Sequence, residues 1–220
     1  MQQPHGPLRS YGRLKSRAIK PRQAELMDSL YPTLAVDPIV GPVAVAGSTW
    51  VEIGFGGGEH LAAQAAANPG VAFLGAEPFV NGMASCLRHV QEQALANVRL
   101  YRGDARELLA ALPAGAIDRL FILFPDPWPK TRQQKRRLVQ AEVVDQVARV
   151  LKSGGRLRFA TDVKSYADQA LERFLANGAL RWTAERADDW RIPPADHVRT
   201  RYEEKNLGDC APVFFDFVRI

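Results

Sequence analysis

The chain has 220 residues, of which 46% are hydrophobic and 24% are charged, and it carries a formal net charge of +5 with a pI near 9.4. This length and composition predict a single globular domain that can bury a core of ordinary size. No apolar run approaches the roughly 20 residues that span a bilayer, and the N-terminus lacks the apolar stretch of a signal peptide. Cys86 and Cys210 are far apart and fit no metal or redox spacing, so we expect reduced thiols in a cytoplasmic protein without a membrane partner.

The first 22 residues differ in composition from the rest of the chain. Their basic residues are Arg9, Arg13, Lys15, Arg17, Lys20 and Arg22. No acidic residue precedes Glu25, and the segment has no apolar periodicity that a core would need. A basic arm and a frayed, solvated terminus explain this composition equally well. We interpret residues 1–22 as a mobile basic arm and residues 23–220 as one domain.

From residue 48 onward, strand patterns alternate with helix patterns. Short apolar strands are predicted over residues 49–55, 71–76, 98–101, 117–124 and 156–160. Helices are predicted over residues 59–67, 80–94, 105–112 and 164–176, and in a stretch with an apolar stripe through Val139, Val143, Val147 and Val150 or Leu151. Gly154 and Gly155 are expected to end that striped helix as a C-cap. Repeated strand–helix units predict an α/β fold with a Rossmann-like, doubly wound, mostly parallel sheet.

The last two predicted strands, residues 180–184 and 213–218, have no clear helix pattern between them. Parallel strands need a long crossover, usually a helix, whereas antiparallel strands do not. We therefore expect these two strands to form an antiparallel hairpin at one edge of the sheet.

An acidic residue stands at the end of each of the first five predicted strands. These residues are Glu52, Glu77, Asp104, Asp126 and Asp162. A doubly wound sheet binds its ligands outside the carboxyl ends of its strands, so all five are expected at the ligand edge. Each of them alone is better explained as a turn former or a helix cap. Their occurrence after five successive strands favours a binding site.

The glycine loop after the first strand reads Glu52-Ile-Gly54-Phe-Gly56-Gly-Gly58. A dinucleotide fingerprint would place a glycine where this chain has Glu59, and a carboxylate there would repel a pyrophosphate. An acid followed by alternating glycines is better suited to S-adenosylmethionine, which has no phosphate. Glu52 would hold the cationic amino group of this cofactor, Glu77 the ribose hydroxyls and Asp104 the adenine amino group.

A proline-rich segment follows the fourth strand and reads Pro125-Asp-Pro-Trp-Pro-Lys130. Proline fixes φ, so the turn is expected to be stiff and to hold Asp126 and Trp128 over the ligand edge. The cations that follow are Lys130, Arg132, Lys135, Arg136 and Arg137. They predict a phosphate-rich substrate, with Trp128 stacking on an unstacked base. The alternative is a solvated helix start, but cations at a helix N-terminus oppose its dipole, which favours a functional role.

These segments resemble the bacterial tRNA (guanine-N7)-methyltransferase family, which belongs to the class I S-adenosylmethionine-dependent methyltransferases. The matching motifs span about residues 48–205, in the family's order, and are Glu52-Ile-Gly-Phe-Gly-Gly-Gly58, Gly75-Ala-Glu77, Pro125-Asp-Pro-Trp-Pro-Lys130, Lys135-Arg-Arg-Leu138, Phe159-Ala-Thr-Asp162 and Thr200-Arg-Tyr-Glu203. The segment around Leu8 to Tyr11 is also similar to the family's N-terminus. The chain departs from the family at Gln133, where the family has a histidine, but no proton transfer is assigned to that position.

The resemblance implies methyl transfer to N7 of a guanine in the variable loop of tRNA. It assigns the cofactor to Glu52, Gly54, Gly56, Glu77, Asp104 and Asp126, with Asp126 also catalytic. It assigns the substrate guanosine to Lys130, Asp162, Thr200, Arg201, Tyr202 and Glu203, and RNA phosphates to Arg132, Lys135, Arg136 and Arg137. Glu203 would accept hydrogen bonds from the Watson–Crick edge of guanine.

The expected chemistry needs neither a base nor a metal. Guanine N7 has a free lone pair and no proton to lose, so alignment and electrostatic stabilisation are expected to dominate. The four histidines, His5, His60, His89 and His197, lie outside the motifs and are expected to be surface or packing residues. The sequence contains no metal-ligand cluster and no pairing of a nucleophile with a base.

Several alternatives stay open on the sequence alone. The chain could methylate another amine or ring nitrogen, although Trp128 follows a single proline where amino-group methylases have two. It could also be a non-enzymatic RNA-binding module, although five acids at the ligand edge give no advantage to such a module. Asp162 is either a substrate ligand or the cap of the next helix, and the motif from Thr200 to Glu203 is either a substrate contact or a loop anchor. The protein is either a monomer or a homodimer.

Overall fold

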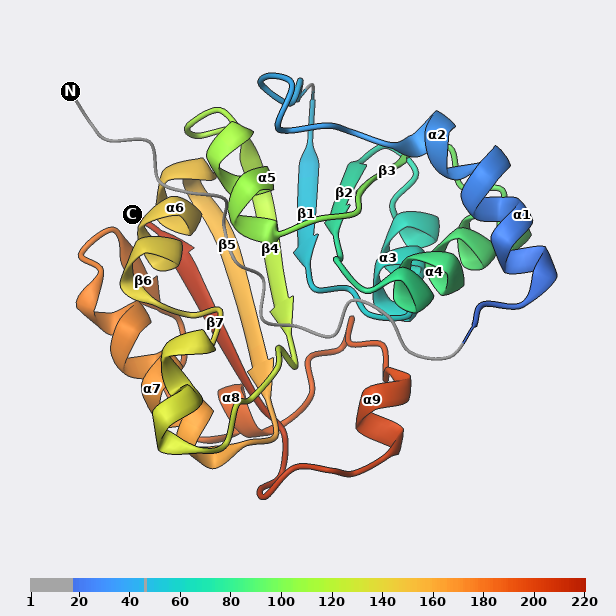
Figure 1. Ribbon diagram of the computed structural model, residues 1–220. Helices are drawn as coiled ribbons and strands as arrows, with labels where there is room; N and C mark the ends of the chain where they lie inside the picture. The colour runs from blue at the N-terminus through green and yellow to red at the C-terminus, as the bar shows by residue number, and fades with distance from the viewer. Residues whose placement is uncertain (1–17, 46) are drawn as a thin grey trace.

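A computed structural model describes residues 18–45 and 47–220 as a seven-stranded sheet with helices on both sides (Figure 1). The strands are β1 (Thr49–Ile53), β2 (Ala72–Ala76), β3 (Val98–Tyr101), β4 (Ile117–Leu123), β5 (Leu151–Thr161), β6 (Leu180–Trp182) and β7 (Val213–Arg219). Their order in the sheet is β3-β2-β1-β4-β5-β7-β6. Strands β1 to β5 pair in parallel, whereas β7 is antiparallel to both β5 and β6. The predicted doubly wound sheet and its terminal hairpin are therefore confirmed.

The helices divide between the two halves of the sheet. They are α1 (Pro21–Ser29), α2 (Tyr31–Leu34), α3 (Glu59–Ala67), α4 (Val80–Glu92), α5 (Ala105–Ala111), α6 (Ala141–Val150), α7 (Lys164–Ala176), α8 (Asp188–Arg191) and α9 (Arg201–Glu204), with a 3₁₀ helix η1 (Thr131–Arg136). In Figure 1, α5, α6 and α7 group around β4, β5 and β7, whereas α1 to α4 lie near β1, β2 and β3. Among these helices of the described chain, none combines the length and the apolar character needed to cross a membrane.

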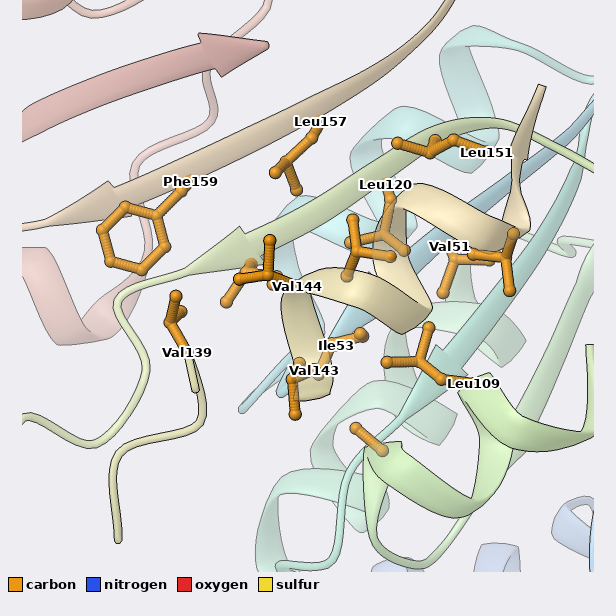
Figure 2. Close-up of a cluster of buried hydrophobic side chains, with 14 of the residues drawn as sticks. Val51, Ile53, Leu109, Leu120, Val139, Val143, Val144, Leu151, Leu157 and Phe159 are labelled. Atoms are coloured by element: carbon orange, nitrogen blue, oxygen red, sulfur yellow. The ribbon is translucent and has the colours of Figure 1, made fainter. Parts of the chain in front are cut away.

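The largest core cluster lies between the sheet and helices α5, α6 and α7. Helix α6 contributes Val143, Val144 and Val147 to this cluster, because valines at helical spacing share one side of a helix. Figure 2 shows Val143 and Val144 among the buried side chains of the sheet. Phe159 of β5 is fully buried, and its ring stacks on that of Phe215 at 6.1 Å between centroids. The apolar stripe predicted from the sequence is therefore buried as expected.

The prediction that Gly154 and Gly155 cap the striped helix is wrong. Helix α6 ends at Val150, and Leu151 already has an extended backbone that begins β5. Gly154 lies inside β5 with φ +76°, and here the pairing of β4 with β5 shifts from Ile117 opposite Leu151 to Arg119 opposite Arg156. A glycine at positive φ is equally typical of a strand irregularity and of a helix cap, so the residue type alone does not separate the two.

The chain between the closing strands is also more ordered than the sequence suggests. Strand β6 ends at Trp182, and the two short helices α8 and α9 precede β7. Helices of one turn are too short to display an apolar period. Residues 1–17 of the predicted arm lie outside the described residues, whereas Pro21 and Arg22, which the prediction included in the arm, form the first turn of α1.

We predict that Gly154→Ala destabilises the protein by about 1–2 kcal/mol, because an alanine side chain is strained at positive φ. The matched control is Gly178→Ala, since an added Cβ at that glycine meets nothing within 4 Å and its φ is ordinary. Urea unfolding followed by tryptophan fluorescence measures both variants. Equal stabilities of the two variants would show that the backbone at position 154 is not constrained.

Candidate active site

The order of the strands brings the acidic residues to one edge of the sheet. Strand order reverses between β1 and β4, because β2 and β3 continue from β1 in one direction and β5 from β4 in the other. Such a switch point opens a crevice at the carboxyl ends of the strands. Glu52 lies near the end of β1, Glu77 and Asp162 directly follow β2 and β5, and Asp104 and Asp126 lie three residues beyond β3 and β4. All five predicted acids therefore lie at this edge.

The glycine loop borders open space next to Glu77. Gly54 and Gly56 have φ of +71° and +54°, and a Cβ added to either would meet no atom within 4 Å. The Glu77 carboxylate accepts a hydrogen bond from the Gly56 amide at 2.8 Å and another from the Phe79 amide at 2.9 Å. This carboxylate therefore joins the first and second strand–helix turns at the switch point.

The pKa of Glu77 is raised from its ordinary value of 4.5 to about 7. Burial is the main cause and the charges of Asp126 and Glu52 add to it, whereas the hydrogen bonds from the Phe79 and Gly56 amides act in the opposite direction. With this pKa, the carboxyl group exchanges between its protonated and ionised forms near neutral pH. The nearby carboxylates of Glu52 and Asp126 add negative charge to the crevice, and negative charge attracts a cationic ligand.

Glu52 is buried, and His60 holds it from the first turn of α3. The distance between His60 Nδ1 and a Glu52 carboxylate oxygen is 2.7 Å, and the imidazole packs edge-on against Phe121. His60 is therefore a packing residue, as expected, but it also orients a predicted cofactor ligand. Glu52 and His60 are eight residues apart, across the turn from β1 to α3, and this spacing is the feature of the sequence that could have indicated the contact.

The local contacts of Asp104 are those of a helix cap. It is the N-cap of α5 and accepts a hydrogen bond from the backbone amide of Arg106 at 2.9 Å. The Arg106 guanidinium also binds both of its carboxylate oxygens. Although burial acts to raise the pKa of Asp104, the bonds from Arg106 outweigh it and lower the pKa.

The proline turn after β4 is bounded by two residues with unusual backbone conformations. Phe124 and Trp128 have φ of +50° and +40°, a region that bulky side chains rarely occupy. Phe124 is held by Tyr202, whose ring centroid is 5.7 Å from its own. Between the two strained residues lies Asp126, which is exposed at the ligand edge. Strain of this kind persists where the surrounding structure fixes it, and it clusters at functional sites.

The basic run divides into an exposed part and a buried residue. Lys130, Arg132 and Lys135 are exposed on or next to η1, and the Arg136 guanidinium lies 5.1 Å from the centroid of the Trp128 ring. Helix α6 begins only at Ala141, so these cations do not stand at its N-terminus and do not oppose its dipole. The exposed residues remain available to a phosphate-rich ligand.

The prediction that Arg137 contacts RNA phosphates is contradicted by its burial, since only 2% of the residue is exposed. Its guanidinium donates to the carbonyl oxygens of Pro127 and Ser165, to the Ser165 hydroxyl and to the Gln169 side chain. Arg137 therefore anchors the proline turn to α7. Its partners are up to 32 residues away, so no local feature of the sequence indicates this role.

Asp162 is buried beside Tyr202 and does not cap α7. The Tyr202 hydroxyl donates to an Asp162 carboxylate oxygen at 3.2 Å. The first amide of α7, that of Lys164, donates instead to Asp209 at 2.7 Å. Of the two alternatives for Asp162, the helix cap is thus excluded.

The motif from Thr200 to Glu203 folds into a capping box at the start of α9. One Glu203 carboxylate oxygen accepts from the Thr200 amide at 2.8 Å, and the other lies 2.8 Å from His197 Nε2. The side chain of Glu203 is only 8% exposed. The geometry therefore favours the loop anchor for Thr200 and Glu203, whereas Arg201 is exposed and pairs with Glu59 at 3.3 Å.

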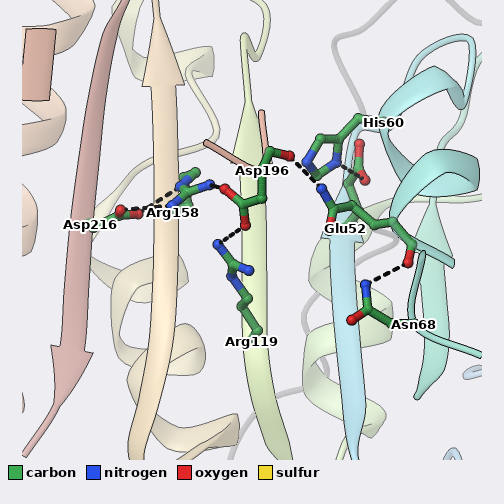
Figure 3. Close-up of polar contacts among 8 residues, drawn as sticks. Glu52, His60, Asn68, Arg119, Arg158, Asp196 and Asp216 are labelled. Carbon is green, nitrogen blue, oxygen red and sulfur yellow. Dashed lines mark hydrogen bonds and ion pairs between the residues drawn. The ribbon is translucent and has the colours of Figure 1, made fainter. Parts of the chain in front are cut away.

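An ion network that the sequence did not reveal fastens this loop to the sheet (Figure 3). Asp196 bridges Arg119 of β4 and Arg158 of β5, and its carbonyl oxygen accepts from Gln64 of α3. Burial alone would raise the pKa of Asp196, but hydrogen bonds and charges from Arg158 and Arg119 bring it to about 2. The carboxylate is thus ionised at neutral pH and holds the chain one residue before His197.

The residues at this edge suit S-adenosylmethionine. Among residues 18–45 and 47–220, no side chain fills the space over Gly54 and Gly56, and the buried carboxylates of Glu52 and Glu77 border it. Carboxylates accept hydrogen bonds from hydroxyl and ammonium groups and attract a sulfonium cation.

The fold and this edge define a class I S-adenosylmethionine-dependent methyltransferase, and a family model described as "Putative methyltransferase" matches residues 46–214. The chain is 60% identical to the tRNA (guanine-N(7)-)-methyltransferase of Caulobacter sp. (strain K31), across 100% of this chain and 98% of the relative. It is 51% identical to the protein of that name from Hyphomonas neptunium (strain ATCC 15444), across 96% and 99% of the two chains. The chain belongs to the tRNA (guanine-N7)-methyltransferase family.

A similar solved structure is that of a mutant of the 16S rRNA (adenine(1408)-N(1))-methyltransferase from Catenulisporales acidiphilia with cosubstrate SAM. Its TM-score is 0.52 at 17% identity, and the match covers 93% of each chain. At this identity the likeness establishes the shared fold.

We predict that Arg137→Met destabilises the protein by about 2–4 kcal/mol, because methionine keeps part of the buried stem but leaves the partners of the guanidinium without a donor. The control Arg132→Met, at an exposed position, should change the free energy of unfolding by less than about 0.5 kcal/mol. Urea unfolding gives both values. If both variants match the wild type, Arg137 is not the anchor of the proline turn.

A second prediction concerns the protonation of Glu77. Because its folded pKa is raised, the folded state keeps its proton while the unfolded state loses it, so stability falls as pH rises from about 4.5 through about 7. We expect the wild type to lose up to about 3 kcal/mol relative to Glu77→Gln between pH 5 and pH 8. The test is the difference in the free energy of unfolding at each pH. A difference that does not change with pH would contradict the raised pKa.

Proposed function

We propose that this protein transfers the methyl group of S-adenosylmethionine to N7 of a guanine in the variable loop of tRNA. The observation that carries the proposal is the acidic edge at the β1–β4 switch point, with Asp126 presented on a stiff proline turn beside exposed cations. The names of the curated relatives support the substrate and the methylated atom. We place the reaction in the cytoplasm, because Cys86 and Cys210 are free thiols and the substrate is tRNA.

The cofactor would lie over the glycine loop. Gly54 and Gly56 allow close approach of the backbone, Glu52 would attract the amino group, and Glu77 would accept from the ribose hydroxyls. Asp104 would receive the adenine amino group with an acceptor lone pair that Arg106 leaves open. When bound, S-adenosylmethionine supplies an electrophilic methyl group on a sulfonium cation.

The protein's own contribution is alignment and charge. Guanine N7 carries a lone pair and no proton, so no side chain has to act as a base. Asp126 lies at the exposed end of the β4 turn, and its charge reaches both Glu77 and Tyr202. A carboxylate there stabilises positive charge as it develops on the purine, and the stiff turn keeps it in place.

The substrate would enter from the side of α9 and η1. Asp162 and Tyr202, which are hydrogen-bonded to each other, would contact the guanosine together with Arg201 and Lys130. Thr200 and Glu203 would support them by holding α9 in position. The phosphates of the variable loop would meet Arg132, Lys135 and Arg136, and the ring of Trp128 would stack on a base.

The test is methyl transfer from labelled S-adenosylmethionine to unmodified tRNA, with the product nucleoside identified and its position mapped. We expect N7-methylguanosine in the variable loop and a loss of rate of about 10²-fold or more for Asp126→Ala. The control Asp168→Ala removes an exposed carboxylate on α7 and should leave the rate unchanged.

Two results would overturn the proposal in different ways. Binding of tRNA without any methyl transfer would favour an RNA-binding module on this fold. Methylation of another nitrogen, on an amine or a different ring position, would keep the cofactor and reject the substrate.

A further inference from the structure

Arginines form a row across the antiparallel end of the sheet, on the face opposite α5, α6 and α7. Arg119 of β4 lies directly opposite Arg156 of β5, and Val218 of β7 lies opposite both Arg156 and Arg181 of β6. Side chains alternate between the two faces of a strand, so Arg158 shares this face with Arg156. Figure 3 shows Arg119 and Arg158 on the same side of their strands.

Part of this positive charge is neutralised within the protein. The Arg158 side chain is 7% exposed and pairs with Asp216 at 2.8 Å, and it shares Asp196 with Arg119. Burial lowers the pKa of Arg119, and the charge of Arg158 lowers it further. Asp196 and Asp216 therefore neutralise the charges of Arg119 and Arg158.

The remaining two arginines, Arg156 and Arg181, are exposed. Within residues 18–45 and 47–220, neither has an ion pair or a side-chain hydrogen bond. Arg156 stands opposite Arg119, so it has no carboxylate partner across the β4–β5 pair. The folded protein gains no stability from this pairing, which points to a role outside folding.

This face is continuous with the substrate side of the crevice. Helices α3 and α4, which pack on the same side of the sheet, cover the core cluster of β2 and β3 and leave Arg156 and Arg181 exposed. Asp196 fastens the loop that leads to α9 onto this face, next to the row. Arg156 lies five residues before the end of β5, or about 16 Å from the ligand edge. A nucleic acid at the crevice can extend over that distance.

We propose that Arg156 and Arg181 bind backbone phosphates of the tRNA substrate, away from the nucleotide that is methylated. The inference rests on the proposed function, because it takes tRNA as the ligand. A guanidinium group presents a planar fork of donors that matches a phosphate. The two side chains start two strand spacings apart, about 10 Å, so they reach different phosphates. The contacts add affinity for tRNA and carry no information on base sequence.

The experiment measures binding of fluorescent tRNA to the full chain by anisotropy over a range of salt concentrations, without cofactor. For the double variant Arg156→Gln and Arg181→Gln we expect Kd to rise about tenfold, and the slope of log Kd against log salt to fall by about 1–2. The melting temperature and the Kd for S-adenosylmethionine should stay at the wild-type values. The control pair, Arg88→Gln and Arg99→Gln, removes the same charge from α4 and β3 and should leave Kd within about twofold.

The inference is overturned if the double variant binds tRNA with the Kd and the salt slope of the wild type. It is equally overturned if the control pair weakens binding as much, because net charge would then explain the effect. Since the assay involves no methyl transfer, its result is independent of the proposed reaction. A protein that binds tRNA through Arg156 and Arg181 but transfers no methyl group would retain this surface and lose the proposed function.

Discussion

The reversal of strand order between β1 and β4 is the constraint on which the rest of the site depends. It opens a crevice at the carboxyl ends of two neighbouring parallel strands, and the loops that follow them enter it from opposite sides. The glycine loop after β1 forms one wall, and the proline turn after β4 forms the other. Residues as distant in the chain as Glu52 and Asp126 therefore share one edge.

Each wall is fixed by a buried polar side chain that lies outside the loop it holds. On the cofactor side, the Glu77 carboxylate holds the amides of Gly56 and Phe79, and on the other side Arg137 holds the proline turn against α7. Asp196, which is partly exposed, fastens the loop that leads to α9 through its ion pairs with Arg119 and Arg158. Buried polar groups of this kind stabilise a structure only when they are fully paired, so each fixes a single geometry.

The sequence predicted the strands and the edge on which the acids lie, because side-chain periodicity marks each element and the right-handed connections of repeated strand–helix units make the sheet parallel. It failed where a residue's partner is distant in the chain. Arg137 looks like one more cation of a basic run, because its acceptors on α7 lie 28 residues further along the chain. The partners of Glu203, Thr200 and His197, are close in the chain, and the Thr-x-x-Glu spacing of a capping box indicates one of them, but the resemblance to the family implied a substrate contact instead. The prediction for Gly154 failed for another reason, because a glycine with positive φ is found both at helix caps and at strand irregularities.

The central claim is that the cofactor occupies the space over the glycine loop, and binding of S-adenosylmethionine to Gly56→Ala tests it most directly. An added Cβ at Gly56 points into that space and is strained at φ +54°. Isothermal titration should show an affinity at least about tenfold weaker than that of the wild type, whereas Gly178→Ala, with its ordinary φ, should bind normally. Wild-type affinity in Gly56→Ala would contradict the account and place the cofactor elsewhere.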